Sequence, residues 1–261
     1  MINFIVCGLE DTLLTQDNEN ISEETIELIN NLIDNGMKFA VATGKNYNAV
    51  KDLFGKVKNK IIYICNDGGV VIYQDKVISK TAVDRLVCLD IVSELAKDEF
   101  IGKFPLLFSG ERDTFVTTHD YSFVNFLKQK GIEAEFIKDM RDIRGEITKI
   151  TIYAKDGFDE KQYEHFYKKW AAKANVAIAD PNRMFVTGEF VTKGMAIALI
   201  QHIYEISPED TVVFGSGYSD INMFEHSFYS YAMQWSDTEV KHAAKHITES
   251  VDTILEDVMR M

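Results

Sequence analysis

Four polar turns carry the residues in this sequence that could do chemistry. They are Cys7-Gly8-Leu9-Glu10-Asp11-Thr12-Leu13-Leu14, Thr43-Gly44-Lys45, Thr192-Lys193-Gly194 and Gly215-Ser216-Gly217-Tyr218-Ser219-Asp220. Carboxylates in the first and last turns could hold a cation or move a proton, whereas a threonine hydroxyl and a lysine ammonium could hold an anion. We expect the turns to meet at one site, because ligands of open parallel sheets bind beyond the carboxyl ends of the strands.

Four short apolar runs predict the strands that would position these turns. They are Phe4–Val6, Phe39–Ala42, Ile61–Cys65 and Thr211–Phe214. Each run is followed by turn residues, which is typical of parallel strands buried on both faces of a sheet. The sequence therefore predicts a single parallel sheet in an α/β fold.

Two helices are predicted to connect these strands. The first is capped by Ser22 and stopped by Gly36, and the second runs from about residue 194 to 204. In the first helix Ile26, Ile29 and Ile33 fall on one stripe, and the second helix carries Leu199, Ile200 and Ile203. Each helix is expected to form a βαβ unit with the strands beside it.

The middle of the chain has a different pattern. Helical stretches are expected around residues 84–97, 122–130 and 159–174, and Ile150, Ile152 and Ala154 alternate with polar residues as in a half-buried strand. We interpret residues 83–183 as an inserted α+β domain. Residues 1–82 and 184–261 would then pair to complete the α/β core domain.

Composition and charge exclude several classes of protein. The 261 residues are 46% hydrophobic and carry a formal charge of −13, which argues against nucleic acid or an anionic membrane as a partner. Cys7, Cys65 and Cys88 have no paired spacing and are interpreted as reduced core thiols. The N-terminus has no basic start and no long apolar run, so we expect a cytoplasmic protein.

Taken together, the four turns resemble the motifs of the haloacid dehalogenase (HAD) superfamily, in its Cof-like branch. That family carries a DxDGT turn, a strand-ending Thr or Ser, a Lys and a GDxxND turn, here aligned through Thr12-Leu13-Leu14. Asn66-Asp67-Gly68-Gly69 and Ala232-Met233 extend the resemblance over the whole chain. It implies a Rossmann-like core with an inserted cap, Mg²⁺ as cofactor and small phosphorylated metabolites as substrates of a phosphatase.

The first turn departs from the family at its nucleophile. The resemblance places the attacking aspartate at Gly8, which has no side chain, and the general acid/base at Glu10, one methylene longer than the usual aspartate. Asp11 stands where the family has glycine. We interpret Asp11 as a turn former rather than as a displaced nucleophile, because aspartate tolerates such turns better than most residues.

The last turn departs from the family at its metal site. The metal-binding aspartate falls on Ser216 and the asparagine on Ser219, whereas Asp220 matches the final aspartate. Mg²⁺ in such sites relies on one or two carboxylates, so Asp220 and the Glu10 carbonyl are expected to hold it weakly or not at all. Asp220 is equally consistent with a residue favoured at the start of a helix.

The phosphate-binding residues of the family match better. The resemblance assigns Thr43, followed by Gly44, and Lys193 to phosphate binding, and we expect free N–H groups at the start of the helix after Lys193 to add to the attraction. With two carboxylates absent, the pocket is predicted to be more positive than in the family. The sequence thus favours binding of inorganic phosphate or a phosphorylated metabolite without a metal.

Three other groups of residues are weaker candidates. His242 and His246 have i,i+4 spacing, but neighbouring lysines favour an exposed helix over a metal site. The aromatic residues Tyr163, Phe166, Tyr167 and Trp170 have helical spacing and are expected to pack inside the cap. Cys7 is expected to point away from the side used by Gly8 and Glu10, as an inert core thiol.

Three functions therefore remain open. The first is a Cof-like protein that binds a phosphorylated metabolite with its phosphatase activity lost or impaired. The second is an active Mg²⁺-dependent phosphatase of sugar phosphates or similar esters that uses Asp11 or Glu10. The third is a protein-interaction module without a ligand, against which the retained Thr43 and Lys193 argue.

Overall fold

A computed structural model describes residues 2–14, 20–97, 104–118 and 120–260, and its contacts divide the chain into two compact units. The first unit contains residues 1–44, 50–79 and 192–261, and the second contains residues 45–49 and 80–191. The second unit is thus an insertion together with the short segment that follows Gly44. The sequence pattern had suggested residues 83–183 for the inserted domain.

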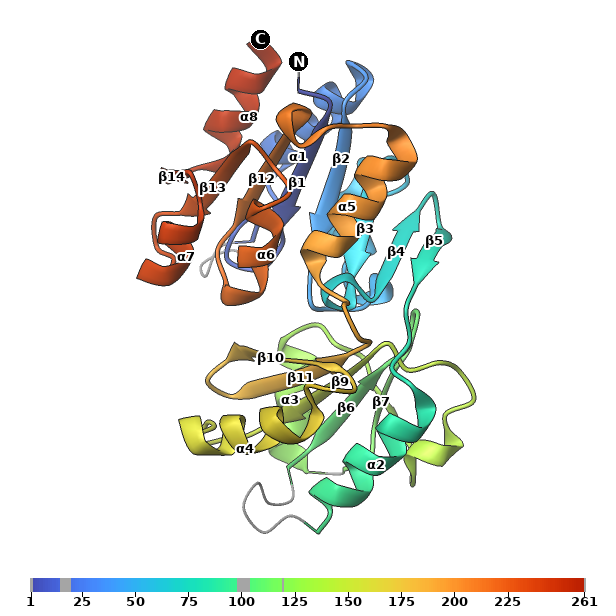
Figure 1. The fold of residues 1–261 in the computed structure, drawn as a ribbon. Coiled ribbons are helices and arrows are strands. Elements are labelled where there is room, and N and C mark those ends of the chain that lie inside the picture. The colour runs from blue at the N-terminus through green and yellow to red at the C-terminus, as the bar shows by residue number, and fades with distance from the viewer. Residues whose placement is uncertain (1, 15–19, 98–103, 119, 261) are drawn as a thin grey trace. The chain divides into compact units, whose positions relative to one another are not determined.

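The first unit is built on an eight-stranded sheet with the order β14-β13-β12-β1-β2-β3-β4-β5 (Figure 1). Its strands are β1 (Phe4–Gly8), β2 (Lys38–Ala42), β3 (Ile62–Cys65), β4 (Val70–Tyr73), β5 (Lys76–Lys80), β12 (Thr211–Gly215), β13 (Tyr229–Met233) and β14 (His246–Thr248). Because β12, β1, β2 and β3 are parallel neighbours, the turns that follow them lie at one edge of the sheet. The predicted α/β fold with a parallel sheet is confirmed.

Helices cover both faces of this sheet (Figure 1). They are α1 (Glu23–Asp34), α5 (Lys193–Tyr204), α6 (Ile221–Phe224), α7 (Thr238–Ala243) and α8 (Val251–Arg260). Residues of α5, α6 and α7 pack with one set of alternating strand residues, such as Phe4 and Val6. A hydrogen bond of 2.8 Å from Thr25 Oγ1 to Asp252 Oδ2 joins α1 to α8. The parallel strands are therefore buried from both sides.

The two connecting helices form as expected, although their buried stripes differ in detail. Ser22 caps α1 and accepts a hydrogen bond from the Thr25 amide, and Gly36 follows the helix with φ of 91°. In α5 the buried apolar residues are Ala196, Ile197 and Ile200, whereas Ile203 is 45% exposed. Of the apolar residues noted in the second helix, Ile200 therefore faces the core and Ile203 faces solvent.

The second unit is an α+β domain with a six-stranded sheet of order β10-β11-β9-β6-β7-β8. Its strands are β6 (Leu106–Ser109), β7 (Thr114–Val116), β8 (Glu135–Phe136), β9 (Lys149–Tyr153), β10 (Asn175–Asp180) and β11 (Arg183–Thr187), and its helices are α2 (Arg85–Leu95), α3 (Tyr121–Gln129) and α4 (Glu160–Trp170). Helices α2 and α4 pack in the larger core, and α3 packs on Leu107 and Val116 from the other face of the sheet. This unit therefore has hydrophobic cores of its own.

The aromatic stripe of α4 is divided between core and solvent. Phe166 and Trp170 are buried, and Tyr163 packs against the same cluster. Tyr167 is 46% exposed, so it does not share the packing face expected for all four residues. Across the described part of the chain, no helix is both long enough and apolar enough to cross a membrane.

Candidate functional site

The turn after β1 is closed by its own backbone. The Leu14 amide donates to the Leu9 carbonyl at 2.8 Å. Asp11 lies at the tip with φ of 53° and an exposed side chain, in the left-handed conformation that glycine adopts without strain. The Trp235 indole N–H donates to the Asp11 carbonyl at 2.8 Å and fixes this strained residue in place.

Gly8 ends β1 inside this turn and faces the other site residues. A Cβ added to Gly8 would lie 3.0 Å from Thr12 Oγ1 and 3.3 Å from Asp220 Oδ2. A Cβ at position 8 would thus point into the site, with small shifts of the Thr12 hydroxyl and the Asp220 carboxylate. Gly8 itself offers the site no nucleophilic atom and no metal ligand.

Glu10 and Thr43 contact each other directly. The Thr43 hydroxyl lies 2.8 Å from Glu10 Oε1 and 3.0 Å from Oε2, and it donates its proton to this carboxylate. Thr43 is fully buried at the end of β2, with Gly44 directly after it. The pairing of β1 with β2 brings the two turns together. The hydroxyl expected to bind phosphate is therefore occupied by a carboxylate of the same site.

Lys193 is the first residue of α5 and is only 5% exposed. Its ammonium donates to Asp220 Oδ1 at 2.7 Å and to Ser219 Oγ at 3.0 Å, and it lies 3.6 Å from Asp67 Oδ1. Burial alone would lower the pKa of Lys193, but the charges of Asp220 and Asp67 outweigh burial and raise the pKa above its ordinary value. Lys193 is thus a buried cation balanced by two carboxylates.

Two of the N–H groups at the start of α5 are already used. The Gly194 amide donates to Asn222 Oδ1 at 2.7 Å, and the Met195 amide donates to Thr192 Oγ1 at 3.1 Å. The expectation that free amides at this helix start would attract an anion is therefore wrong for Gly194 and Met195. The physical reason is that a cap residue and a neighbouring asparagine satisfy these donors.

Asp220 holds the last turn together. Its Oδ2 accepts hydrogen bonds from the amides of Ser216 at 2.9 Å and Gly217 at 3.0 Å, while Oδ1 accepts from Lys193. The side chain is 3% exposed. Asp220 thus combines a brace for the turn with an ion pair, and both of its oxygens are engaged.

Ser216 links the last turn to the first. Its hydroxyl donates to the Glu10 carbonyl oxygen at 3.0 Å and accepts from Thr12 Oγ1 at 3.0 Å. Two turns that are far apart in sequence are therefore joined by neutral hydrogen bonds. These bonds lie where the family resemblance puts a metal between two carboxylates.

Comparison with known proteins decides the family. A family model of haloacid dehalogenase-like hydrolases matches residues 5–254. This chain belongs to the haloacid dehalogenase-like hydrolases.

Relatives of this HAD-like hydrolase carry phosphatase in their names. One from Buchnera aphidicola is 23% identical over 230 residues, covering 87% of this chain and 84% of the relative. The 5-amino-6-(5-phospho-D-ribitylamino)uracil phosphatase YbjI of Escherichia coli is 19% identical, with coverage of 94% and 90%.

Solved structures share the fold over nearly the full length. A haloacid dehalogenase-like hydrolase from Bacteroides thetaiotaomicron has a TM-score of 0.85 at 17% identity, covering 99% of this chain and 100% of the other. A HAD subclass IIB sugar phosphatase has a TM-score of 0.84 at 20% identity, with the same coverage. At this level of identity the likeness establishes the fold of the HAD-like chain and leaves its chemistry to the site residues.

Family members use Mg²⁺, but the residues of this HAD-like site do not fit a dedicated Mg²⁺ ion. Gly8 supplies no ligand, Ser216 supplies a neutral hydroxyl, and Asp220 is bound to Lys193 and two amides. The described residues contain no group of three or more His, Cys, Asp or Glu side chains arranged to hold a metal. A hard cation needs carboxylate oxygens that are free to coordinate it.

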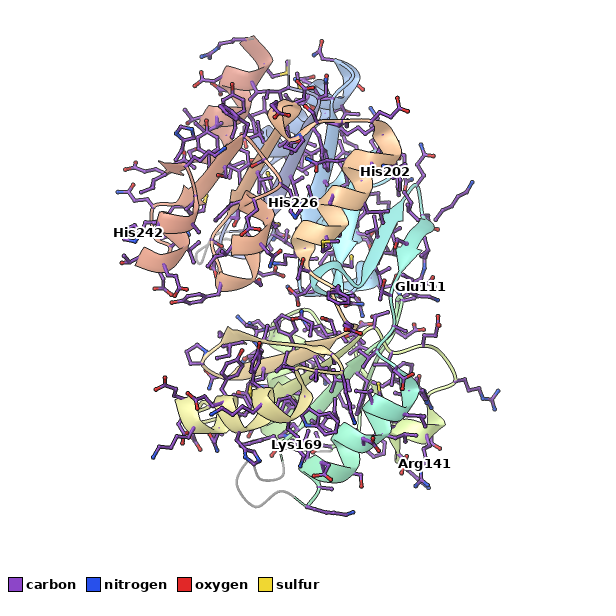
Figure 2. All side chains as sticks on the ribbon, in the orientation of Figure 1. Glu111, Arg141, Lys169, His202, His226 and His242 are labelled. Carbon is purple, nitrogen blue, oxygen red and sulfur yellow. The ribbon has the colours of Figure 1, made fainter. Side chains whose placement is uncertain are left out.

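The histidines of this HAD-like chain do not form a helical pair. His242 lies exposed in α7 (Figure 2), whereas His246 begins β14 and stacks on Tyr231 with ring centroids 5.0 Å apart. The predicted exposed helix carrying both residues is wrong, because α7 ends at Ala243. Strand pairing with β13 outweighs the helical spacing.

The cysteines of the HAD-like chain are buried and unpaired, as expected for core thiols. Burial raises the pKa of Cys7 and Cys65, and it raises the pKa of Cys88 to about 12. These thiols are protonated at neutral pH and are poor nucleophiles. Cys7 therefore does not replace the missing nucleophile.

Three residues that contribute contacts to the HAD-like site were not predicted from the sequence. Asp67 pairs with Lys193, Asn222 anchors α5, and Trp235 fixes the first turn. Asp67 could have been found, because it lies two residues after a predicted strand at the same edge of the sheet. The Trp235 contact joins residues 224 positions apart and has no local signal in the sequence.

Proposed function

We propose that this HAD-like chain binds inorganic phosphate or a small phosphorylated metabolite and has lost most or all of the family's phosphatase activity. The observation that carries the proposal is the glycine at position 8, whose missing side chain faces Thr12 and Asp220. Covalent phosphoryl transfer needs an attacking atom at this position and a metal beside it. Without the nucleophile and the metal, the main contributions that lower the activation barrier are lost, and each is worth several powers of ten in rate.

The neighbouring acids are poor substitutes for the nucleophile. Both carboxylate oxygens of Glu10 lie within hydrogen-bond distance of the Thr43 hydroxyl. Asp11 is exposed at the tip of a turn whose carbonyl is held by Trp235. Moving the Glu10 carboxylate into the position of the missing one would break its contact with Thr43, and bringing Asp11 there would require its exposed side chain to turn inward from the tip.

Retained donors support the binding of a phosphate group. Thr43 supplies a buried hydroxyl and Lys193 a buried ammonium, and charge-assisted hydrogen bonds of this kind are the strong ones. Phosphate would take these donors from Glu10 and from Asp220 and Asp67. The relative YbjI is named for a phosphorylated substrate, which supports the same class of ligand for this chain.

The test is a calorimetric titration of the whole protein with inorganic phosphate. We expect saturable binding that is lost in Lys193→Met, provided that variant is folded by circular dichroism, and weakened in Thr43→Val. Equal heats of phosphate binding for the unmodified chain, Lys193→Met and Thr43→Val would contradict the proposal.

An active Mg²⁺-dependent phosphatase remains the second candidate, favoured by membership of a hydrolase family. It would use Asp11 or Glu10 after rearrangement of the first turn. Mg²⁺-dependent turnover by the unmodified chain that is abolished by Asp11→Asn or Glu10→Gln would favour this candidate.

A further inference from the structure

The Glu10 carboxylate lies on the same hydroxyl that a bound phosphate would use. Thr43 Oγ1 is 2.8 Å and 3.0 Å from the two carboxylate oxygens. A threonine hydroxyl has a single proton to donate, so it serves one strong acceptor at a time. Because Thr43 is fully buried, an anion and Glu10 must compete for this donor.

The same carboxylate also acts on the second retained donor. Burial lowers the pKa of Lys193, and the charges of Asp220 and Asp67 raise it, with a further rise from the charge of Glu10. Glu10 therefore contacts Thr43 directly and acts on Lys193 through its charge. These are the two groups that the proposed phosphate would contact.

The length of the side chain at position 10 makes this arrangement possible. The family pattern has aspartate here, and glutamate reaches one methylene further from the turn towards β2. Glu10 is only partly buried, so its side chain has a route towards solvent. It can leave the site by rotation of its side chain without unfolding the turn.

We propose that Glu10 is an internal occupant of the anion site, which phosphate must displace in order to bind. This inference rests on the proposed function and adds a residue that sets the affinity. The fraction of molecules with Glu10 away from Thr43 limits the apparent affinity, as for any site whose competent state is only partly populated. The ligand favoured by this arrangement carries at least two negative charges, because a singly charged carboxylate has to be replaced.

Two substitutions at position 10 test the inference. Glu10→Gln keeps the shape and removes the charge, and Glu10→Ala removes the occupant altogether. Glu225→Gln, at an exposed position after α6, is the matched control for loss of one negative charge. Each protein is titrated with inorganic phosphate and separately with sulfate, and thermal unfolding verifies that each is folded.

We expect both Glu10 variants to bind phosphate and sulfate about tenfold more tightly than the unmodified chain, since one charged hydrogen bond is no longer displaced. Glu225→Gln should bind like the unmodified chain. Equal affinity in the unmodified chain and both Glu10 variants would overturn the inference while leaving the proposed function intact. If no protein of the set binds either anion, including folded Glu10→Ala, both the inference and the proposed function are wrong.

Discussion

At the scale of single residues, the ion pair of Lys193 and Asp220 is the most consequential contact of the site. Both side chains are almost fully buried, and Asp220 also holds two amides of the last turn. We predict that Asp220→Asn lowers the free energy of unfolding by about 3 kcal/mol, because it leaves a buried charge poorly compensated. Urea denaturation measures this loss.

An exposed aspartate provides the control for that substitution. Asp257 pairs with Arg260 on the surface of α8, and Asp257→Asn should cost at most about 0.5 kcal/mol. The double variant Asp220→Asn/Lys193→Met should lose less than the sum of the single variants, since the two residues interact. A loss below about 1 kcal/mol for Asp220→Asn alone would contradict this account of the site.

The three cysteines give a second prediction at this scale. Burial raises the pKa of each thiol, for Cys88 from the ordinary 9.0 to about 12. We expect none of the three to react with a thiol reagent such as DTNB at pH 8 in the native protein, and all three to react in guanidinium chloride. Rapid labelling of native protein would show that one of them is accessible and ionised.

The same shift predicts how stability depends on pH. A thiol that ionises more readily in the unfolded state favours unfolding once the pH exceeds its unfolded pKa. The contribution of Cys88 to stability is therefore complete below pH 9 and lost as the pH rises towards 12. Replacing Cys88 by alanine should flatten this part of the urea-midpoint profile, and an unchanged profile would assign the alkaline loss to other groups.

Much of the site could be predicted at the residue scale, but its contacts could not. The strand pattern predicted that Glu10, Thr43, Lys193 and Asp220 would meet at one edge of the sheet. It did not predict that Thr43 donates a hydrogen bond to Glu10, or that Asp67 pairs with Lys193 alongside Asp220. Those contacts depend on side-chain rotamers and on burial, which residue spacing does not determine.

At the scale of elements, the start of α5 depends on close packing at Gly194. A Cβ at this position would lie 2.2 Å from the Asn222 carbonyl oxygen. Alanine normally stabilises a helix relative to glycine by about 0.5–1 kcal/mol, but here the overlap with backbone reverses the sign. We predict that Gly194→Ala lowers the free energy of unfolding by about 1–3 kcal/mol.

Gly145→Ala is the control for this prediction, because an added Cβ there has no heavy atom within 4 Å. It should leave the urea midpoint almost unchanged. Stabilisation of the protein by Gly194→Ala would mean that α5 and α6 are not packed as described.

Elements were predictable where local pattern and tertiary packing agree. The four parallel strands and α1 follow from apolar runs and a Ser22 cap that the fold retains. His246 is the contrary case, since helical spacing after α7 is overridden by pairing of β14 with β13.

At the scale of the whole molecule, the inserted unit has the features of an independent domain. Its sheet is covered by α2 and α4 on one face and by α3 on the other. We predict that a fragment of residues 80–191 unfolds cooperatively in urea with its own midpoint. A gradual, non-cooperative loss of circular dichroism would indicate that this unit needs the rest of the chain.

At this scale we propose a HAD-like scaffold that lacks its nucleophile and a metal ligand but keeps Thr43 and Lys193 as phosphate donors. Hydrolysis of a panel of phosphoesters with Mg²⁺ tests it most directly, comparing the unmodified chain with Gly8→Asp/Ser216→Asp and using Lys193→Met as the control for contaminating phosphatase. We predict background hydrolysis by the unmodified chain and Mg²⁺-dependent turnover by the double variant. Turnover by the unmodified chain at about 1 per second or faster, lost in Lys193→Met, would contradict it.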